Sequence, residues 1–562
     1  MTEISGADIL LQSIIQEGVR LVFGYPGGSV IPLYDRLVKY PKLRHILVRH
    51  EQAAAFAANG VGRATGKPGV CFATSGPGAT NLVTGVADAM LDSIPMIAVT
   101  GQVHSHLLGS DAFQETDSIG IFLPVVKHSY FVSDPKDLAR VIKEAFYIAQ
   151  NGRPGPVHID ITKDAFLKTA KYEYPKKVSL PGFPKIHSVS SSDLEKARDL
   201  IQASKKPVAI VGHGVVISRA FQELKSFLEK SDIPAVCTLH GLSALPSAHS
   251  KNLGLLGMHG NVYANYAVHN SDLVISLGSR FDDRITGRLK DFAPDAKVIH
   301  FEIDPSEIEK NVRVTVPLIG DISETLKKLN PLLKQKKCES WWKVIDTWKD
   351  KFAIEKVHAC EDRKCLNTLR ACDALSILAE ETKGNVLFVP DVGQHQMWAA
   401  QVFPVKKENS HFYSGGLGAM GFSLPTAMGI QLAMPDEEVW SVSGDGGFQM
   451  NSQELITLIQ DKIPLKMMII NNHYLGMVRQ WQELFHDKTY SFVDMKTPDF
   501  VKLAEANEIP GFRANNQKET REAIKKARKI KGPVLIECNV SQEENVFPMV
   551  AAGDSLGETR IQ

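Results

Sequence analysis

The chain alternates short apolar runs with amphipathic stretches over most of its length. The runs at 70–74, 96–100 and 207–211 are rich in β-branched residues, which favours buried strands. Strands that alternate with helical patterns are typical of βα units around parallel sheets. The pattern therefore predicts an α/β fold.

Two stretches interrupt this alternation and predict linkers. Residues 172–192 carry Pro175, Pro181 and Pro184 among lysines and serines, a composition that disfavours regular structure. Residues 326–364 are rich in charged residues, although the segment from Ser340 onward has a helical pattern. We therefore expect three domains, at 1–175, 190–335 and 365–545.

The two outer segments share a local pattern. In the first, Ser75-Gly76-Pro77-Gly78 precedes a helical pattern, then Ile94-Pro95 and a strand. In the third, Ser443-Gly444-Asp445-Gly446 precedes a helical pattern, then Ile463-Pro464 and a strand. This order indicates either a pseudo-symmetric pair of domains or a chance likeness of two common βα turns, and the spacing alone leaves both open.

The glycine turn of the third segment predicts an anion and metal site. The strand 440–443 leads into Gly444-Asp445-Gly446-Gly447, where glycines let the backbone approach a ligand. Asn451 and Glu454 predict a capped helix start, which attracts anions. The next strand, 465–470, delivers Asn472 to the same sheet edge as Asp445. Such oxygen ligands suit Mg²⁺ that is also bound to phosphate.

Composition and charge narrow the class of protein. Hydrophobic residues make up 44% and charged residues 23% of the 562 residues, as in an ordinary soluble globular protein. The formal net charge of +1 gives no electrostatic footprint for nucleic acid or an anionic membrane. No apolar run approaches the ~18 residues of a membrane span, and the first residues lack the features of a signal or transit peptide.

The 7 cysteines are scattered along the chain. Cys360, Cys365 and Cys372 are too widely spaced for a zinc knuckle, so reduced thiols in a cytoplasmic protein are expected.

The Gly-Asp-Gly turn with the following Asn-Asn resembles the diphosphate–Mg²⁺ motif of thiamine diphosphate enzymes. The chain as a whole resembles the catalytic large subunits of the acetohydroxyacid (acetolactate) synthase family. The matching segments lie in all three predicted domains, at 23–28, 49–52, 109–115, 152–156, 280–284 and 476–481.

The resemblance implies two pseudo-symmetric thiamine diphosphate-binding domains that flank a Rossmann-like, FAD-binding middle domain. The first binds the aminopyrimidine and the third the diphosphate, across a dimer interface. The implied thiamine diphosphate residues are Glu51, Val392, Gly393, Gln394, His395, Gly418, Met420, Gly444, Gly446 and Gly447. The implied Mg²⁺ ligands are Asp445, Asn472 and the backbone of Tyr474.

Glu51 is the implied activating acid of the cofactor. A buried carboxyl shares a proton readily with a ring nitrogen, because burial disfavours its charged form. An arbitrary glutamate before a helix is instead a solvated carboxylate, and the alternative for Met420 and Trp481 is a core side chain. The position of Glu51 after the Gly-Tyr-Pro-Gly-Gly segment at 24–28 favours the catalytic interpretation.

The implied FAD residues lie in the middle domain, apart from one arginine of the first. Gly212-His213-Gly214 follows a strand but lacks the third glycine of a dinucleotide fingerprint, so alone it indicates only a βα turn. The implied set is Arg153, Gly212, Gly214, Met258, His259, Gly278, Arg280, Asp282, Arg284, Glu302 and Asp321.

The implied reaction decarboxylates pyruvate and ligates the hydroxyethyl unit on thiamine diphosphate to pyruvate or 2-ketobutyrate, the first common step of branched-chain amino-acid biosynthesis. An arginine is expected to bind the acceptor carboxylate. The implied residues for catalysis and substrate are Glu51, Gly28, Gln114, Lys163, Arg284, Trp481 and Met477. Ser29 and His104 depart from the commonest pattern, in which alanine and proline stand there.

Related enzymes are separated by single features. Glyoxylate carboligases lack the activating glutamate, pyruvate decarboxylases carry an early His-His pair, and catabolic acetolactate synthases lack the stretch Arg280–Arg284. A pyruvate oxidase and a non-catalytic ligand sensor remain as alternatives. The expected partners are a second copy of the chain, as a homodimer or homotetramer, and a small regulatory subunit.

Overall fold

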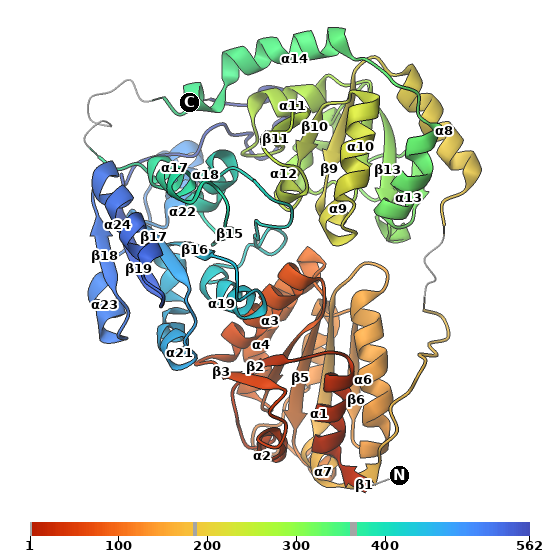
Figure 1. The fold of residues 1–562 in the computed structure, drawn as a ribbon, viewed down its shortest axis with the longest axis vertical. Coiled ribbons are helices and arrows are strands. Elements are labelled where there is room, and N and C mark those ends of the chain that lie inside the picture. The colour runs from red at the N-terminus through yellow and green to blue at the C-terminus, as the bar shows by residue number, and fades with distance from the viewer. Residues whose placement is uncertain (1–2, 184–187, 360–367, 562) are drawn as a thin grey trace.

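The computed structural model describes residues 3–183, 188–359 and 368–561. Three parallel sheets with flanking helices form three bodies, which meet around the centre of the molecule (Figure 1). This arrangement confirms the predicted α/β fold with parallel sheets. The region after residue 171 has no helix or strand up to Ser190 in its described part, as its prolines predict.

The first body contains the N-terminal sheet, in the order β3-β2-β4-β5-β7-β6. A short antiparallel pair, β1 with β8, joins its two chain ends. The strands are β1 (Glu3–Ser5), β2 (Leu21–Gly24), β3 (Arg44–Leu47), β4 (Gly69–Ala73), β5 (Met96–Gln102), β6 (His128–Val132), β7 (Pro156–Thr162) and β8 (Thr169–Lys171). The helices are α1 (Gly6–Gln16), α2 (Ile31–Leu37), α3 (Glu51–Thr65), α4 (Pro77–Asp92), α5 (Ser118–Phe122), α6 (Pro135–Gln150) and α7 (Lys163–Leu167).

The middle body has the strand order β11-β10-β9-β12-β13-β14. Counted along the chain, this is the doubly wound dinucleotide-binding order, with its topological switch point between β9 and β12. The strands are β9 (Pro207–Val211), β10 (Ala235–Cys237), β11 (Asn252–Leu255), β12 (Leu273–Leu277), β13 (Lys297–Glu302) and β14 (Val316–Ile319). The helices are α8 (Ser191–Ala203), α9 (His213–Ile217), α10 (Phe221–Ser231), α11 (Val262–His269), α12 (Asp283–Thr286), α13 (Ile322–Leu329), α14 (Glu339–Phe352) and α15 (Ile354–Val357).

The third body has the order β15-β16-β17-β19-β18. The strands are β15 (Leu387–Pro390), β16 (Val439–Gly444), β17 (Lys466–Asn471), β18 (Gly511–Ala514) and β19 (Val534–Asn539). The helices are α17 (Ala371–Thr382), α18 (Gln394–Val402), α19 (Ser423–Ala433), α20 (Asp445–Gln449), α21 (Leu455–Gln460), α22 (Gly476–Phe485), α23 (Phe500–Ala506) and α24 (Gln517–Lys529).

The two outer sheets have one topology. The order β2-β4-β5-β7-β6 of the first corresponds, strand by strand, to β15-β16-β17-β19-β18 of the third, and β3 is the additional strand. The strands that precede the two glycine turns, β4 and β16, hold equivalent places. The predicted pseudo-symmetric pair is therefore confirmed, and the chance interpretation is excluded.

Asn451 holds the N-cap position of the 3₁₀ turn that leads into α21, as predicted, but the predicted capping bond is wrong. The helix α20 already begins at Asp445, within the glycine turn, and a 3₁₀ turn, Ser452–Glu454, separates it from α21. The side chain of Asn451 makes no capping bond, because its Nδ2 donates to the carbonyl of Gly421 at 2.7 Å. A tertiary contact has replaced the local one.

Helices α3 and α19 hold the outer bodies together. A Cβ on Gly60 would lie 2.3 Å from the carbonyl oxygen of Thr426, and one on Gly429 would lie 2.0 Å from that of Ala57. The two helices therefore meet backbone to backbone, inside a hydrophobic core that is shared between both bodies. This contact fixes where Glu51, the first residue of α3, lies relative to the third body.

Two further findings concern the cysteines and the possibility of membrane-spanning helices. The described cysteines, Cys71, Cys237, Cys338, Cys372 and Cys538, are free and buried, and Cys360 and Cys365 lie outside the described residues. Among the described helices, none has both the length and the apolar character that a membrane crossing needs.

Candidate active site

Asp445 lies at the carboxyl end of β16 and opens α20. Its side chain is buried, and burial raises the pKa of its carboxyl to about 7, although the N–H groups of Asp445, Gly446 and His473 act in the opposite direction. In the described part of the chain, its buried Oδ2 has no hydrogen-bond partner. Because buried polar atoms are almost always paired, this oxygen fits a ligand for a bound cation.

Asn472 lies beside Asp445, on the loop after the neighbouring strand β17. The backbone N–H of His473 approaches the Asp445 carboxyl, and Asn472 Oδ1 accepts the N–H of Tyr474 at 3.0 Å. The structure thus brings together the three residues that were predicted as Mg²⁺ ligands.

Glycines open the space around Asp445. A Cβ on Gly446 would lie 3.2–3.4 Å from side-chain atoms of Leu475, Met495 and Met420, so that a side chain there would fill the cradle. On the other side, His395 Nε2 accepts the N–H of Gly444 at 3.2 Å, and burial lowers the pKa of His395 to about 3. A neutral imidazole therefore supports the turn.

Asp391 organises the loops around this cradle, although the sequence analysis did not single it out. Its carboxylate accepts the N–H groups of Val392, Gly421 and Ser423, and burial raises its pKa to about 6. These bonds tie the segment after β15, with Val392, Gly393 and the first residue of α18, Gln394, to the loop that holds Gly418 and Met420. The sequence feature that could have indicated Asp391 is an acidic residue directly after a buried strand.

A second cluster lies at the carboxyl edge of the N-terminal sheet. Glu51 is 9% exposed and its Oε2 accepts from Asn81 Nδ2 at 3.0 Å. A Cβ on Gly78 would lie 3.3 Å from Glu51 Oε1, and one on Gly76 would lie 3.0 Å from the carbonyl oxygen of Gln114. Gln114 and Glu51 therefore flank the same glycine turn.

Gly28 and Lys163 belong to this edge as well. A Cβ on Gly28 would have no atom within 4 Å, so it faces open space. The next residue, Ser29, is buried, and its hydroxyl accepts the N–H of Ser75 at 2.9 Å and contacts Thr74 Oγ1 at the same distance. Lys163 opens α7 directly after β7, whose last residue pairs with Gln102 of β5. His104, the second departure, lies just beyond β5.

A cavity of about 520 Å³ lies where the three bodies meet. It opens at the switch point of the middle sheet, as expected for a dinucleotide site, and its volume is ordinary for a ligand pocket. The predicted FAD residues that line it are Arg153, Gly214, Met258, His259, Gly278, Arg280, Asp282, Arg284, Glu302 and Asp321. Met477, Trp481, Val392 and Gly418 of the third body line it too.

Gly212 does not line the cavity. A Cβ at this position would lie 2.2 Å from the carbonyl oxygen of Gly278, and one on Gly214 would lie 2.8 Å from Gly278 Cα. These glycines allow the turns after β9 and β12 to touch. Gly212 therefore lies behind the residues that line the cavity and supports them.

The charged groups of the cavity differ in how far they are already paired. Arg153 pairs with Glu307 at 2.9 Å and Glu302 accepts the N–H groups of Ile303 and Asp304, while burial raises the pKa of Glu302. Arg284 is 58% exposed and lies 3.5 Å from Asp283, so its guanidinium remains available for an anionic ligand. Burial lowers the pKa of His259 to about 4.

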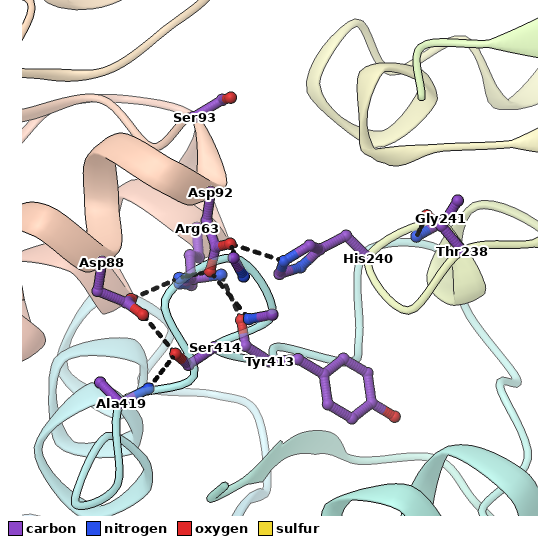
Figure 2. Close-up of polar contacts among 12 residues, drawn as sticks. Arg63, Asp88, Asp92, Ser93, Thr238, His240, Gly241, Tyr413, Ser414 and Ala419 are labelled. Carbon is purple, nitrogen blue, oxygen red and sulfur yellow. Dashed lines mark hydrogen bonds and ion pairs between the residues drawn. The ribbon is translucent and has the colours of Figure 1, made fainter. Parts of the chain in front are cut away.

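A buried ionic cluster lies against the same cavity and had no signal in the sequence. Arg63 of α3 and Asp88 and Asp92 of α4 meet His240 of the middle body and Ser414 of the third body (Figure 2). We call these five residues the Asp92 cluster. On an amphipathic helix, acids such as Asp88 and Asp92 are usually solvated, which is why sequence reasoning missed them.

Comparison with known proteins agrees with this architecture. Three family descriptions of thiamine pyrophosphate enzymes match the chain. They are the N-terminal TPP binding domain at residues 4–121, the central domain at 194–329 and the C-terminal TPP binding domain at 391–538. The chain is also 45% identical over 565 residues to an acetolactate synthase of Mycobacterium bovis, which covers 99% of this chain and 91% of the relative. The chain belongs to the acetolactate synthase family.

Large subunits of this family from distant organisms are equally similar. That of Pyropia yezoensis is 45% identical over 569 residues, covering 99% of this chain and 95% of the relative. That of Corynebacterium glutamicum is 45% identical over 559 residues, covering 98% and 89%. Membership of the acetolactate synthase family confirms the resemblance and the order of domains that the sequence predicted.

Proposed function

We propose that this chain is the catalytic large subunit of an acetolactate synthase. It would decarboxylate pyruvate and ligate the two-carbon unit to pyruvate or 2-ketobutyrate, the first common step of branched-chain amino-acid biosynthesis. The observation that carries the proposal is the unpartnered buried oxygen of Asp445 in its glycine cradle. We also propose domain boundaries at 1–175, 190–335 and 365–545, the last starting outside the described residues.

The cradle fits thiamine diphosphate with Mg²⁺. Asp445, Asn472 and the Tyr474 carbonyl would hold the metal, and Val392–His395, Gly418 and Gly444–Gly447 would hold the diphosphate. Thiamine diphosphate, when bound, supplies an electron sink for carbanion chemistry. Met420, whose Cε lies 3.4 Å from where a Gly446 Cβ would be, would support the folded cofactor.

Glu51 would act on the aminopyrimidine end. Its buried carboxyl would hold a proton shared with the N1′ ring nitrogen, while Asn81 keeps the second oxygen in place. Gly28, Gln114 and Lys163, which lie at the same sheet edge, would line the substrate side.

The cavity at the switch point fits FAD, bound without net redox turnover. Its lining of glycine turns, arginines and strand-end acids provides the donors and acceptors for a dinucleotide. Arg284, which is exposed and weakly paired, would bind the carboxylate of the acceptor, and Trp481 and Met477 would contact its alkyl end.

We propose that the working unit is at least a dimer. In the described part of the chain, neither Glu51 nor Asp445 lines this cavity, so the cavity does not join the two half-sites of one chain. Large apolar side chains are exposed near both half-sites, including Tyr25, Phe113, Tyr490 and Phe492. A homodimer or homotetramer with a small regulatory subunit, cytoplasmic and without nucleic acid, fits this surface and the net charge of +1.

Product identification tests the proposal. The purified chain with pyruvate, Mg²⁺, thiamine diphosphate and FAD should form 2-acetolactate, identified by mass, and should also form 2-aceto-2-hydroxybutyrate when 2-ketobutyrate is added. Omission of thiamine diphosphate should abolish both products. Flavin bleaching by pyruvate at the rate of turnover would instead indicate a pyruvate oxidase, and no turnover a ligand sensor.

A further inference from the structure

The Asp92 cluster joins all three bodies through one carboxylate. Asp92 Oδ1 accepts both His240 Nε2 of the middle body, at 2.8 Å, and the N–H of Gly416 of the third body, at 2.7 Å. Its Oδ2 accepts Arg63 Nη2 at 2.6 Å and the N–H of Gly415 at 3.3 Å. A carboxylate has about four acceptor positions, so all are in use.

The loop that contains Gly415 and Gly416 packs directly against Asp92 and His240, with no space between them. A Cβ on Gly415 would lie 2.5 Å from His240 Nε2, and a Cβ on Gly416 would lie 2.8 Å from Asp92 Oδ1. His240 and the segment from Ser414 to Gly418 also line the 520 Å³ cavity. Asp92 lines the cavity as well, so its carboxylate is part of the same wall. Figure 2 shows Asp92 between Arg63 and His240, next to the loop at Ser414.

The same loop continues into the diphosphate cradle. Ser414 Oγ accepts the N–H of Ala419 at 2.9 Å, and the next residue, Met420, reaches the cradle at Gly446. The N–H of Gly421 then donates to Asp391, and its carbonyl accepts from Asn451. Asp391 in turn lies 3.1 Å from where a Cβ on Gly447 of the glycine turn would be. A chain of direct contacts thus runs from His240, through Asp92 and the loop, to the cradle.

The cluster keeps Asp92 charged. Burial alone would raise the pKa of Asp92, but His240 and Arg63 outweigh it and hold that pKa far below its usual range. Burial and the neighbouring Asp92 raise the pKa of Asp88 to about 6. An ionised Asp92 binds its donors through charge-assisted hydrogen bonds, which are stronger than neutral ones.

We propose that Asp92 is a positioning residue that couples the two cofactor sites, so that a dinucleotide bound in the cavity strengthens the binding of thiamine diphosphate in the cradle. A ligand that packs against His240 fixes Asp92 and with it the loop, so the second ligand finds this loop already ordered. The coupling is reciprocal by thermodynamic necessity. This inference rests on the proposed function, in which the two sites hold FAD and thiamine diphosphate.

The test measures the Kd of thiamine diphosphate by calorimetry at saturating Mg²⁺, with and without saturating FAD. In the wild-type chain FAD should tighten binding by at least about fivefold, the lower end of typical coupling. We call the Kd without FAD divided by the Kd with FAD the coupling ratio. In His240→Leu, which removes the hydrogen-bond donor of the middle body, this ratio should fall to about one, whereas the Kd without FAD should stay within about twofold of wild type. His240→Gln, which keeps a donor, should restore part of the ratio.

The controls separate the possible failures. His128→Leu, an exposed histidine at the sheet edge, should keep the wild-type ratio. Asp92→Asn should lose the ratio, and a lower melting temperature with an unchanged ratio would reduce Asp92 to a structural role. A wild-type ratio in His240→Leu, or a ratio of one in a wild-type chain that binds both groups, would overturn the inference. A wild-type chain that binds neither group would instead contradict the proposed function.

Discussion

Single residues carry the proposed chemistry, and Glu51 is the sharpest case. Glu51→Gln keeps the size of the side chain and its contact with Asn81 but removes the shared proton. We expect turnover to fall by at least ~10²-fold, the scale of a lost acid–base group, with the fold intact. Circular dichroism and initial rates measure this, with Glu324→Gln, whose side chain is exposed on α13, as the matched control. Near-normal activity would remove Glu51 from the mechanism.

Asp445 should make the stability of the metal-free chain depend on pH. Burial raises its pKa from 3.8 to about 7, so the folded chain holds a proton there that the unfolded chain releases. Stability is therefore lost as pH rises from about 4 to about 7. Because Asn cannot ionise, the urea midpoint of Asp445→Asn should rise relative to that of wild type between about pH 5 and pH 8. With Mg²⁺ and thiamine diphosphate added, wild type should instead be the more stable of the two proteins. A pH-independent difference between the two proteins would contradict it.

Trp481 and Arg284 should have separable effects on the acceptor. One methylene in an apolar pocket is worth roughly 1–3 kcal/mol of discrimination, so Trp481→Leu should still make 2-acetolactate but lose most of its preference for 2-ketobutyrate. Arg284→Lys keeps the positive charge but loses the paired N–H donors of the guanidinium, so the rates with both acceptors should fall together. Product ratios from mixed substrates measure this. An unchanged ratio in Trp481→Leu would make the indole a structural side chain only.

At the scale of elements, the α3–α19 contact should tolerate no side chain. Alanine normally stabilises a helix by about 1 kcal/mol relative to glycine. In Gly429→Ala, however, the new Cβ would lie 2.0 Å from the carbonyl oxygen of Ala57, so we expect a net loss of about 1–3 kcal/mol. Urea unfolding measures this against Gly532→Ala, which meets no atom within 4 Å. Equal stability of Gly429→Ala and wild type would show that the helices separate easily.

The elements also show what sequence reasoning can reach. Strands such as β4, β9 and β17 were predictable because buried parallel strands are continuous apolar runs, and Asp445 and Asn472 followed from the topology of neighbouring strands. The cap at Asn451 failed because Gly421, thirty residues away, takes its side chain. The Asp92 cluster could not be predicted, since its members come from three bodies and each has an ordinary local pattern.

At the scale of the whole molecule, each chain carries two half-sites, and neither Glu51 nor Asp445 is among the described residues that line the 520 Å³ cavity. The fold places Glu51 at the edge of the first sheet and Asp445 at the corresponding edge of the third, each with exposed apolar side chains nearby. A pair of chains related by a twofold axis would bring the Glu51 half-site of one to the Asp445 half-site of the other. The central claim is that acetolactate is made in such a shared site.

Mixing two inactive variants tests this claim most directly. Glu51→Gln and Asp445→Ala should each be inactive alone, but subunit exchange would create hybrid dimers with one intact site. We predict that an equal mixture recovers about a quarter of wild-type 2-acetolactate formation, since half of the dimers are hybrids and each has one working site of two. Persistent inactivity, with hybrid dimers verified by differently tagged chains, would contradict a site shared between Glu51 and Asp445.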